Sequence, residues 1–225
     1  MQTLVMSRPL WCIFLLAVIL QAIFFGAALN ESGSFFTAFP GFDGYYHIKF
    51  AAITFAQGLV THFPWFPYSF WNEHFADHHF LYHILLIPFT LNDLTFGAKL
   101  STVFFSSVML VCFFELLKKS KIPFPWVWVV ILAIASHVFL YRLSLPRAPV
   151  IALSFLFLGQ HFILGKNYKT LAALSVLFVW LYGGFTIFIL FAALMILSRL
   201  LIEKQIDHKS AFSVSAGVIA GLLTH

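Results

Sequence analysis

The chain consists largely of long apolar runs, and these runs limit the folds that it can adopt. Charged residues make up only 9% of its 225 residues, whereas soluble domains carry roughly 25%. A chain with so few charges cannot cover its own surface in water, so the sequence predicts an integral membrane protein. The seven apolar runs lie at residues 10–29, 96–117, 124–141, 150–164, 171–182, 185–200 and 211–225.

Each run predicts a helix, because an isolated strand cannot satisfy its backbone hydrogen bonds in lipid. The expected fold is therefore an all-α bundle of six to seven transmembrane helices in a single domain, residues 1–225. The first run follows Arg8 and lacks a small-residue cleavage site, which is typical of an uncleaved signal anchor. The last run is still apolar at His225, so we expect either a fragment of a longer protein or a minimal module.

The distribution of Lys and Arg predicts the orientation of the helices. A further apolar stretch at residues 80–91 rises only about 18 Å as a helix, too short for a hydrocarbon core of about 30 Å. If this stretch does not cross, nine of the 13 basic residues lie on the side of the N-terminus. The positive-inside rule prefers that arrangement. It makes the N-terminus cytoplasmic and residues 30–95 an external loop; the four outside basic residues are Lys49, Lys99, Arg142 and Arg147.

The external loop gathers most of the polar chemistry of the chain. It holds five of the eight acidic residues, and its aromatic segment at residues 63–71 predicts a position at the membrane interface. Six of the ten histidines lie in it: His47, His62, His74, His78, His79 and His83.

Two interfacial helices are predicted within this loop, at about residues 44–59 and 78–90. In the first, apolar residues recur at spacings of three and four while His47 falls off the apolar stripe. Asp43 and Asp77 each precede one of these helices. Each aspartate is either a helix N-cap or an ionised carboxylate suited to bind a metal or act as a base, and the two roles are compatible.

The segment around Asp77 is dense in groups that bind metals or transfer protons. Asp77, His78 and His79 are consecutive, and Glu73 lies one turn earlier. Such groups could ligate a divalent ion or shuttle a proton. Their spacing matches no zinc signature such as H-E-x-x-H, and single histidines at an aromatic interface are often only amphipathic filler.

Residues 41–49, GFDGYYHIK, resemble the first external loop of the GT-C glycosyltransferases. The nearest likeness is the catalytic subunit of oligosaccharyltransferases, in which an F-D-P-aromatic-aromatic segment opens a helix. The basic turn at residues 118–121 and the segment WLYGGF at residues 180–185 also resemble that family. The resemblance covers most of residues 1–205, and Asp43 with its helix is its specific part.

The chain also departs from the family. The second external loop of the family carries an acidic pair, whereas residues 141–147 here, YRLSLPR, contain no acid. The soluble domain of the oligosaccharyltransferase, with its W-W-D-Y-G motif, is absent too. Sugar transfer from a polyprenyl carrier remains the expectation, while protein N-glycosylation in particular is disfavoured.

The resemblance implies that Asp43 binds the catalytic divalent metal and faces the acceptor. The other candidate residues follow from their own chemistry and position. Asp43, with Asp77, would be catalytic. Asp43, Asp77, His78 and His79 are the candidate ligands of a divalent cation, Mg²⁺ or Mn²⁺. The candidates for binding the donor phosphate are Arg142, Arg147 and Lys49, which are otherwise interfacial anchors.

The expected function is transfer of a sugar or oligosaccharide from a polyprenyl-phosphate-linked donor to an acceptor glycan, lipid or protein on the external face. The alternatives are a non-catalytic or truncated membrane subunit, and a membrane binding protein with a metal-binding external loop. We expect a multi-pass protein of the bacterial inner membrane rather than the endoplasmic reticulum. Its partners would be the lipid bilayer and a further membrane subunit, and no nucleic acid.

Overall fold

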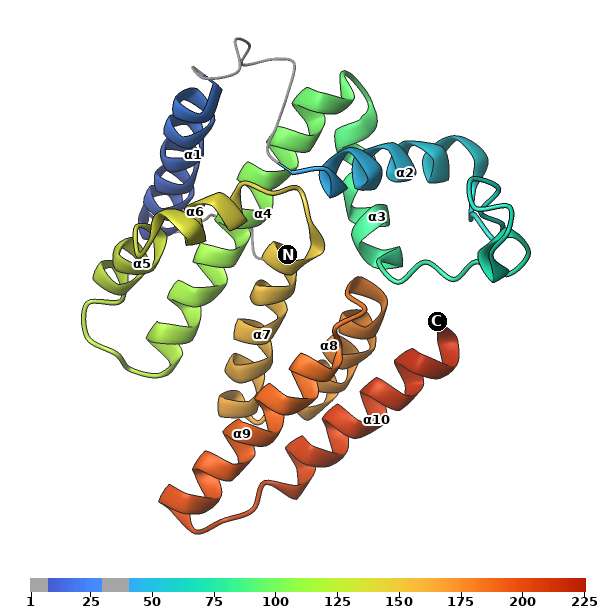
Figure 1. Cartoon of the computed structure of the whole chain (residues 1–225). Helices are drawn as coiled ribbons and strands as arrows, with labels where there is room; N and C mark the ends of the chain where they lie inside the picture. Colours follow the sequence, from blue (N-terminus) through green and yellow to red (C-terminus); the bar gives the residue numbers. More distant parts are fainter. Residues whose placement is uncertain (1–7, 30–40) are drawn as a thin grey trace, which may run out of the picture.

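The computed structural model describes residues 8–29 and 41–225, which form helices and no strand (Figure 1). The all-α prediction is confirmed for these residues. The α-helices are α1 (Arg8–Leu29), α2 (Asp43–Gln57), α3 (Phe80–Leu86), α4 (Leu94–Lys119), α5 (Pro125–Ala133), α6 (His137–Leu143), α7 (Ala148–Gly165), α8 (Tyr168–Leu181), α9 (Thr186–Glu203) and α10 (His208–Thr224). Two short 3₁₀ helices, η1 (Phe70–Asn72) and η2 (Ile87–Thr90), flank α3 in sequence.

Several of these helices are suited to cross a membrane. In the described part of the chain, α4, α7 and α9 are each long and apolar enough to do so, and α5 with α6 makes a fourth if this bent pair is one span. Shorter apolar helices cover residues 11–23, 80–90 and 168–181. A membrane protein is thus supported by helix length and composition. The expected number of six to seven crossings stays a prediction.

The span expected over residues 124–141 is divided in two. Helix α5 ends at Ala133, α6 begins at His137, and the two axes differ by 89°. Ser136 explains the restart, because its hydroxyl accepts a hydrogen bond from the backbone N–H of Phe139 at 3.1 Å. A serine in this N-cap position satisfies one of the free N–H groups of a new helix.

The long helices pack in pairs, with α4 against α1 and α7, and α8 against α7 and α10. Glycines allow α8 and α10 to approach closely. A Cβ atom on Gly217 would collide with the carbonyl oxygen of Ala172, and one on Gly221 would lie 2.9 Å from Cβ of Val179. Close approach of this kind is typical of helix pairs in membranes, where small residues increase the contact between helices.

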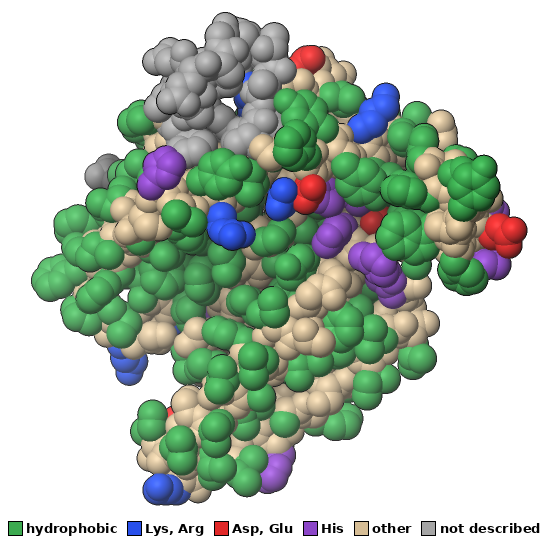
Figure 2. All heavy atoms as spheres, viewed as in Figure 1, with side chains coloured by type: hydrophobic (Ala, Val, Ile, Leu, Met, Phe, Trp, Pro, Cys, Tyr) green, Lys and Arg blue, Asp and Glu red, His purple; other side chains and the backbone are tan. Residues whose placement is uncertain are grey.

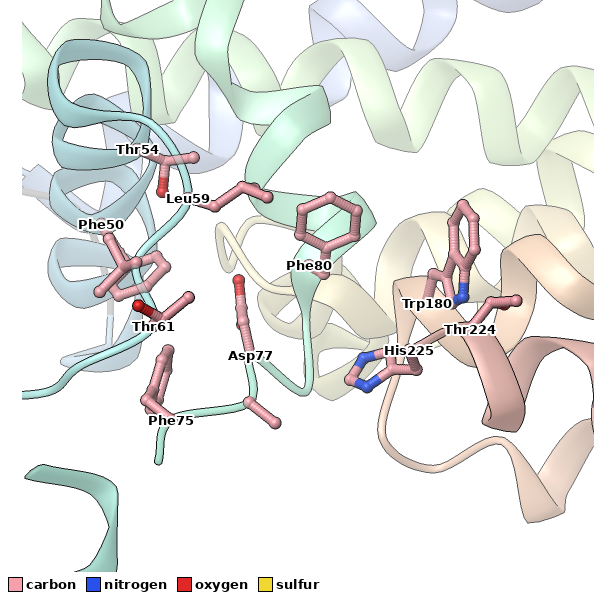
Figure 3. A pocket seen from close by; sticks show the side chains of 12 residues that line it. Phe50, Thr54, Leu59, Thr61, Phe75, Asp77, Phe80, Trp180, Thr224 and His225 are labelled. Carbon is pink, nitrogen blue, oxygen red and sulfur yellow. The ribbon is translucent and has the colours of Figure 1, made fainter. Parts of the chain in front are cut away.

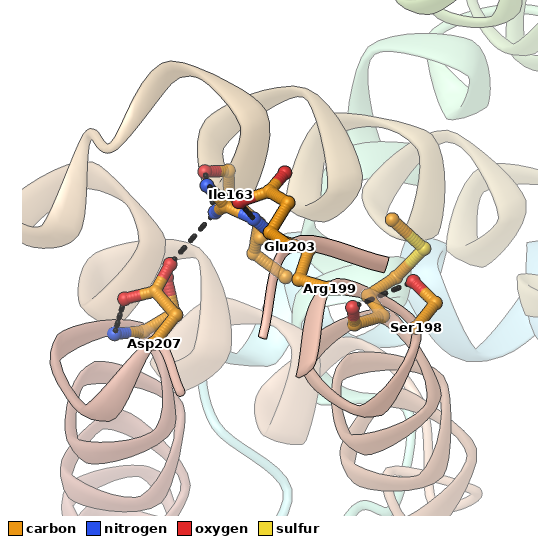
Figure 4. A network of polar contacts seen from close by, with 7 residues as sticks. Ile163, Ser198, Arg199, Glu203 and Asp207 are labelled. Carbon is orange, nitrogen blue, oxygen red and sulfur yellow. Dashed lines mark hydrogen bonds and ion pairs between the residues drawn. The ribbon is translucent and has the colours of Figure 1, made fainter. Parts of the chain in front are cut away.

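A polar network joins α9 to α10 (Figure 4). The guanidinium of Arg199 lies 2.9 Å from the carboxylate of Asp207 and 3.3 Å from that of Glu203. Asp207 also caps α10, since it accepts a hydrogen bond from the backbone N–H of Ser210 at 3.1 Å. The turn between the two helices is therefore held by charge as well as by the cap.

The predicted external loop begins in the described residues with α2, which lies crosswise to α4 (Figure 1). Helix α2 packs against α3, η2 and α4, and α3 packs against α8. The helix predicted at residues 78–90 begins only at Phe80 and tightens into η2 from Ile87. Pro88 gives the physical reason, because it lacks an N–H and its ring clashes with the preceding turn.

Candidate functional site

Polar side chains gather beside α2 on a face that is otherwise largely hydrophobic. Figure 2 shows His, Lys or Arg, and Asp or Glu side chains together in this region. Three features make up the region: an ion pair, an apolar groove and a chain of hydrogen-bonded histidines.

The ion pair joins Asp43 of α2 to Arg147, which directly precedes α7. An Oδ of Asp43 lies 3.0 Å from an Nη of Arg147, with 57% of the Asp43 side chain and 34% of the Arg147 side chain exposed. Asp43 is the first residue of α2 and not its N-cap, a position that Phe42 occupies. Gly41, at φ +84°, lets the chain turn into α2 against Leu145.

An apolar groove of about 240 Å³ lies between α6, α7 and α8, and both Arg142 and Arg147 line it. Its walls are otherwise aliphatic and aromatic, and they include Leu153, Phe178 and Tyr182. The structure therefore brings two of the three predicted phosphate-binding residues to one groove. The third, Lys49, is exposed on α2 and does not line this groove.

A chain of short hydrogen bonds runs from Asp77 into the protein. Nδ1 of His83 lies 2.6 Å from an Oδ of Asp77, and Nε2 of His83 lies 2.8 Å from Nδ1 of His47. Both histidines are buried. With Asp77 ionised and His83 neutral, Nδ1–H of His83 donates to the carboxylate, and Nε2 of His83 accepts from Nδ1–H of His47.

Burial controls the proton affinity of this cluster. Burial, together with the smaller effects of the nearby His83, His79 and Arg147, lowers the pKa of His47 to about 2. Burial also lowers the pKa of His79. It raises the pKa of Tyr46 to about 12, and the charge of Asp77 acts in the same direction. His47 and Tyr46 are therefore neutral at physiological pH.

His78 and His79 face the segment after α8. The ring of His79 stacks on Tyr182, with centroids 5.7 Å apart and planes 12° apart. A Cβ atom on Gly183 would lie 3.5 Å from Cβ of His78. Residues 41–49 and 180–185 thus both adjoin the histidine cluster.

Asp77 is not the N-cap of α3, because that position belongs to His79, whose backbone N–H donates to Asp77 at 3.0 Å. Asp77 also lines a pocket of about 270 Å³, with Phe80 and Trp180 nearby (Figure 3). Asp43 does not line this pocket. Asp43 instead contacts Arg147, which lines the groove between α6, α7 and α8. His83 and His47 connect Asp77 to the helix that begins at Asp43.

The predicted divalent-cation site stays a prediction. Among the side chains that the structure describes, no group of three or more His, Cys, Asp or Glu is arranged to hold a metal ion. Asp43 contacts Arg147, and Asp77 contacts His83 and the backbone of His79.

Sequence reasoning assigned no role in this cluster to His47 and His83. The spacing was a partial signal, because His47 lies four residues after Asp43 on α2, and His83 lies four residues after His79, the N-cap of α3. Comparison with known proteins adds no further assignment: no protein family, curated protein or solved structure matches this chain.

Proposed function

We propose that this chain is a GT-C-like membrane glycosyltransferase. It transfers a sugar or oligosaccharide from a polyprenyl-phosphate-linked donor to an acceptor on the external face. The observation that carries the proposal is the ion pair between Asp43 and Arg147, since it couples an accessible carboxylate to an apolar groove lined by two arginines.

The groove suits both parts of the donor, the isoprenoid chain and the phosphate. Its apolar walls match an isoprenoid chain, whose burial is favourable in proportion to the apolar area covered. Arg142 and Arg147 supply positive charge to a phosphate, and guanidinium groups bind phosphate through two parallel hydrogen bonds. The same charges would stabilise the phosphate that leaves when the sugar is transferred.

Asp43 suits the acceptor. Its carboxylate is more than half exposed, so an acceptor can reach it, and it lies at the positive end of the α2 dipole. In this position it orients the acceptor and takes its proton as the new glycosidic bond forms. Arg142 and Arg147 supply the positive charge that faces the donor phosphate.

The proposed setting extends this assignment. The chain crosses the inner membrane of a bacterium six or seven times as a GT-C-like bundle, with its N-terminus in the cytoplasm. The region around α2 then faces the external side, where the phosphate of the donor lies at the interface and its tail lies in the lipid.

The test uses the full chain in proteoliposomes with a radiolabelled undecaprenyl-phosphate-linked sugar, in the presence of Mg²⁺ and, separately, of EDTA. We expect Asp43→Asn to lower the transfer rate by at least about 100-fold, the usual contribution of an acid–base group. Glu73→Gln, which removes an exposed carboxylate elsewhere in the loop, is the matched control. Full activity of Asp43→Asn would refute the role of Asp43. Donor binding without transfer under either condition would favour the non-catalytic subunit.

A further inference from the structure

The ion pair between Asp43 and Arg147 places a carboxylate on the guanidinium that is proposed to bind phosphate. Asp43 begins α2 and Arg147 directly precedes α7, far away in sequence. The two side chains meet in this 3.0 Å contact, where Gly41 also closely approaches Leu145 and Arg147. A carboxylate and a phosphate compete for the same N–H groups of arginine. The proposed phosphate site thus already holds an anion from its own chain.

The guanidinium of Arg147 is only partly satisfied in this state. Among the residues that the structure describes, its buried Nε has no hydrogen-bond partner, although an Nη contacts Asp43. A buried donor without a partner is unfavourable, and it is normally explained by a missing ligand or water. A phosphate offers more acceptor oxygens than one carboxylate, so it can satisfy Nε as well as Nη.

The ion pair is weak enough to exchange. More than half of the Asp43 side chain and a third of the Arg147 side chain are exposed, and ion pairs that are this exposed contribute little. Arg142 lines the same groove and adds a second positive charge that a phosphate can use. The weakness of the exposed ion pair and the added charge of Arg142 both favour a phosphate over Asp43 as the partner of Arg147.

We propose that Asp43 is an internal substitute for the donor phosphate: it occupies Arg147 in the empty site and is displaced when a lipid-linked phosphate binds. Asp43 then becomes free to meet the acceptor, so the donor binds before the acceptor does. Asp43 also makes the site selective, because a neutral isoprenoid cannot displace it. This inference rests on the proposed function and adds the order of binding to it.

The test measures binding of farnesyl phosphate to the full chain in nanodiscs, with farnesol as the uncharged control. Asp43→Asn removes the competing anion, so we expect its dissociation constant to be roughly two- to fivefold lower than that of the unmodified chain. Arg147→Gln should weaken binding by more than tenfold, and the double variant should bind as weakly as Arg147→Gln alone. Glu73→Gln should bind like the unmodified chain.

The outcomes separate the two proposals. Weaker or unchanged binding by Asp43→Asn overturns the exchange, because Asp43 would then assist the ligand or have no effect on it, while the transferase proposal survives. If the unmodified chain binds farnesyl phosphate no better than farnesol, both proposals fail. Tighter binding of farnesol by Asp43→Asn also contradicts the exchange, since a neutral ligand does not compete with a carboxylate.

Discussion

Nδ1 of His83 lies 2.6 Å from the carboxylate of Asp77, and Nε2 of the same ring is hydrogen-bonded to the buried His47 on α2. These two hydrogen bonds connect the segment before α3 to α2, the helix that begins at Asp43. When both imidazoles are neutral, the one carboxylate of Asp77 fixes which nitrogen of each ring carries the proton. The arrangement positions the site, and its loss should first be visible as a loss of stability.

Asp77→Ala tests this directly. It leaves the Nδ1–H of His83 buried without an acceptor, which should destabilise the protein by about 2 kcal/mol. Asp77→Asn keeps an acceptor oxygen and should cost roughly half as much. Thermal unfolding in detergent measures both, with the exposed Glu73→Ala as a control that is expected to change stability by less than about 0.5 kcal/mol. Equal stability of Asp77→Ala and Glu73→Ala would contradict the role of this chain of contacts.

The stability should also fall in acid because of His47. Its folded pKa of about 2 lies below the usual value of 6.5, so the unfolded chain binds a proton here that the folded protein does not. The stabilising contribution is therefore complete above pH 6.5 and is lost as the pH falls below it, at up to about 1.4 kcal/mol per pH unit. His79, whose pKa is also lowered, adds in the same direction.

Unfolding temperatures between pH 7.5 and 5, for the unmodified chain and for His47→Gln, measure this contribution. The variant should be less stable at pH 7.5, yet its stability should fall less steeply with acid. Parallel curves for the two proteins would mean that His47 does not titrate differently in the folded and unfolded states.

The contact between α8 and α10 provides a separate prediction about packing. Gly217→Ala would drive a Cβ atom against the carbonyl oxygen of Ala172, and because both groups are on helix backbones, the helices must separate. We expect a loss of about 1–3 kcal/mol, the usual cost of overpacking. Ser215→Ala, on the exposed side of α10, should be neutral. A neutral Gly217→Ala would contradict the close approach of these helices.

The apolar runs were enough to predict an all-helical membrane protein, and the long runs at 96–117, 150–164 and 185–200 correspond to α4, α7 and α9. The break near Ser136 was not predicted, because a capping serine inside an apolar run changes hydropathy very little. The pattern predicts the short helix at residues 78–90, but periodicity alone does not indicate its change to a 3₁₀ helix from Ile87, beside Pro88.

The candidate site was partly predictable. Asp43 and Arg147 were both selected from sequence, yet their contact joins residues more than 100 positions apart, and no periodicity reports such a pairing. His83 was counted among the loop histidines, but only the fold brings it against His47. The pattern thus identified the types of residue, while tertiary packing decided which of them meet.

Arg199 provides a prediction in which burial separates two ion pairs of the same residue. The side chain of Asp207 is 11% exposed, and the side chain of Glu203 is 49% exposed. Arg199→Gln leaves the carboxylate of Asp207 without its charged partner and should cost about 2–3 kcal/mol, as for charged hydrogen bonds. Glu203→Gln removes only the exposed pair and should cost less than about 1 kcal/mol. Similar losses for the two variants, in thermal unfolding, would contradict this ranking.

The predicted orientation can be tested with single cysteines in whole cells. Cys12 and Cys112 are first replaced by serine, and then Glu73→Cys and Lys204→Cys are made separately. Both positions are exposed. Glu73 lies outside the helices suited to cross a membrane, and Lys204 follows the end of one, α9. If residues 30–95 are external and the basic turns are cytoplasmic, a membrane-impermeant maleimide should label Glu73→Cys in intact cells. The same reagent should label Lys204→Cys only after the cells are permeabilised, because Lys204 follows the end of α9 among the basic residues assigned to the inside. Labelling of both positions in intact cells would contradict the assignment of nine basic residues to the cytoplasm, and the reverse pattern would mean that Asp43 and the groove face the cytoplasm.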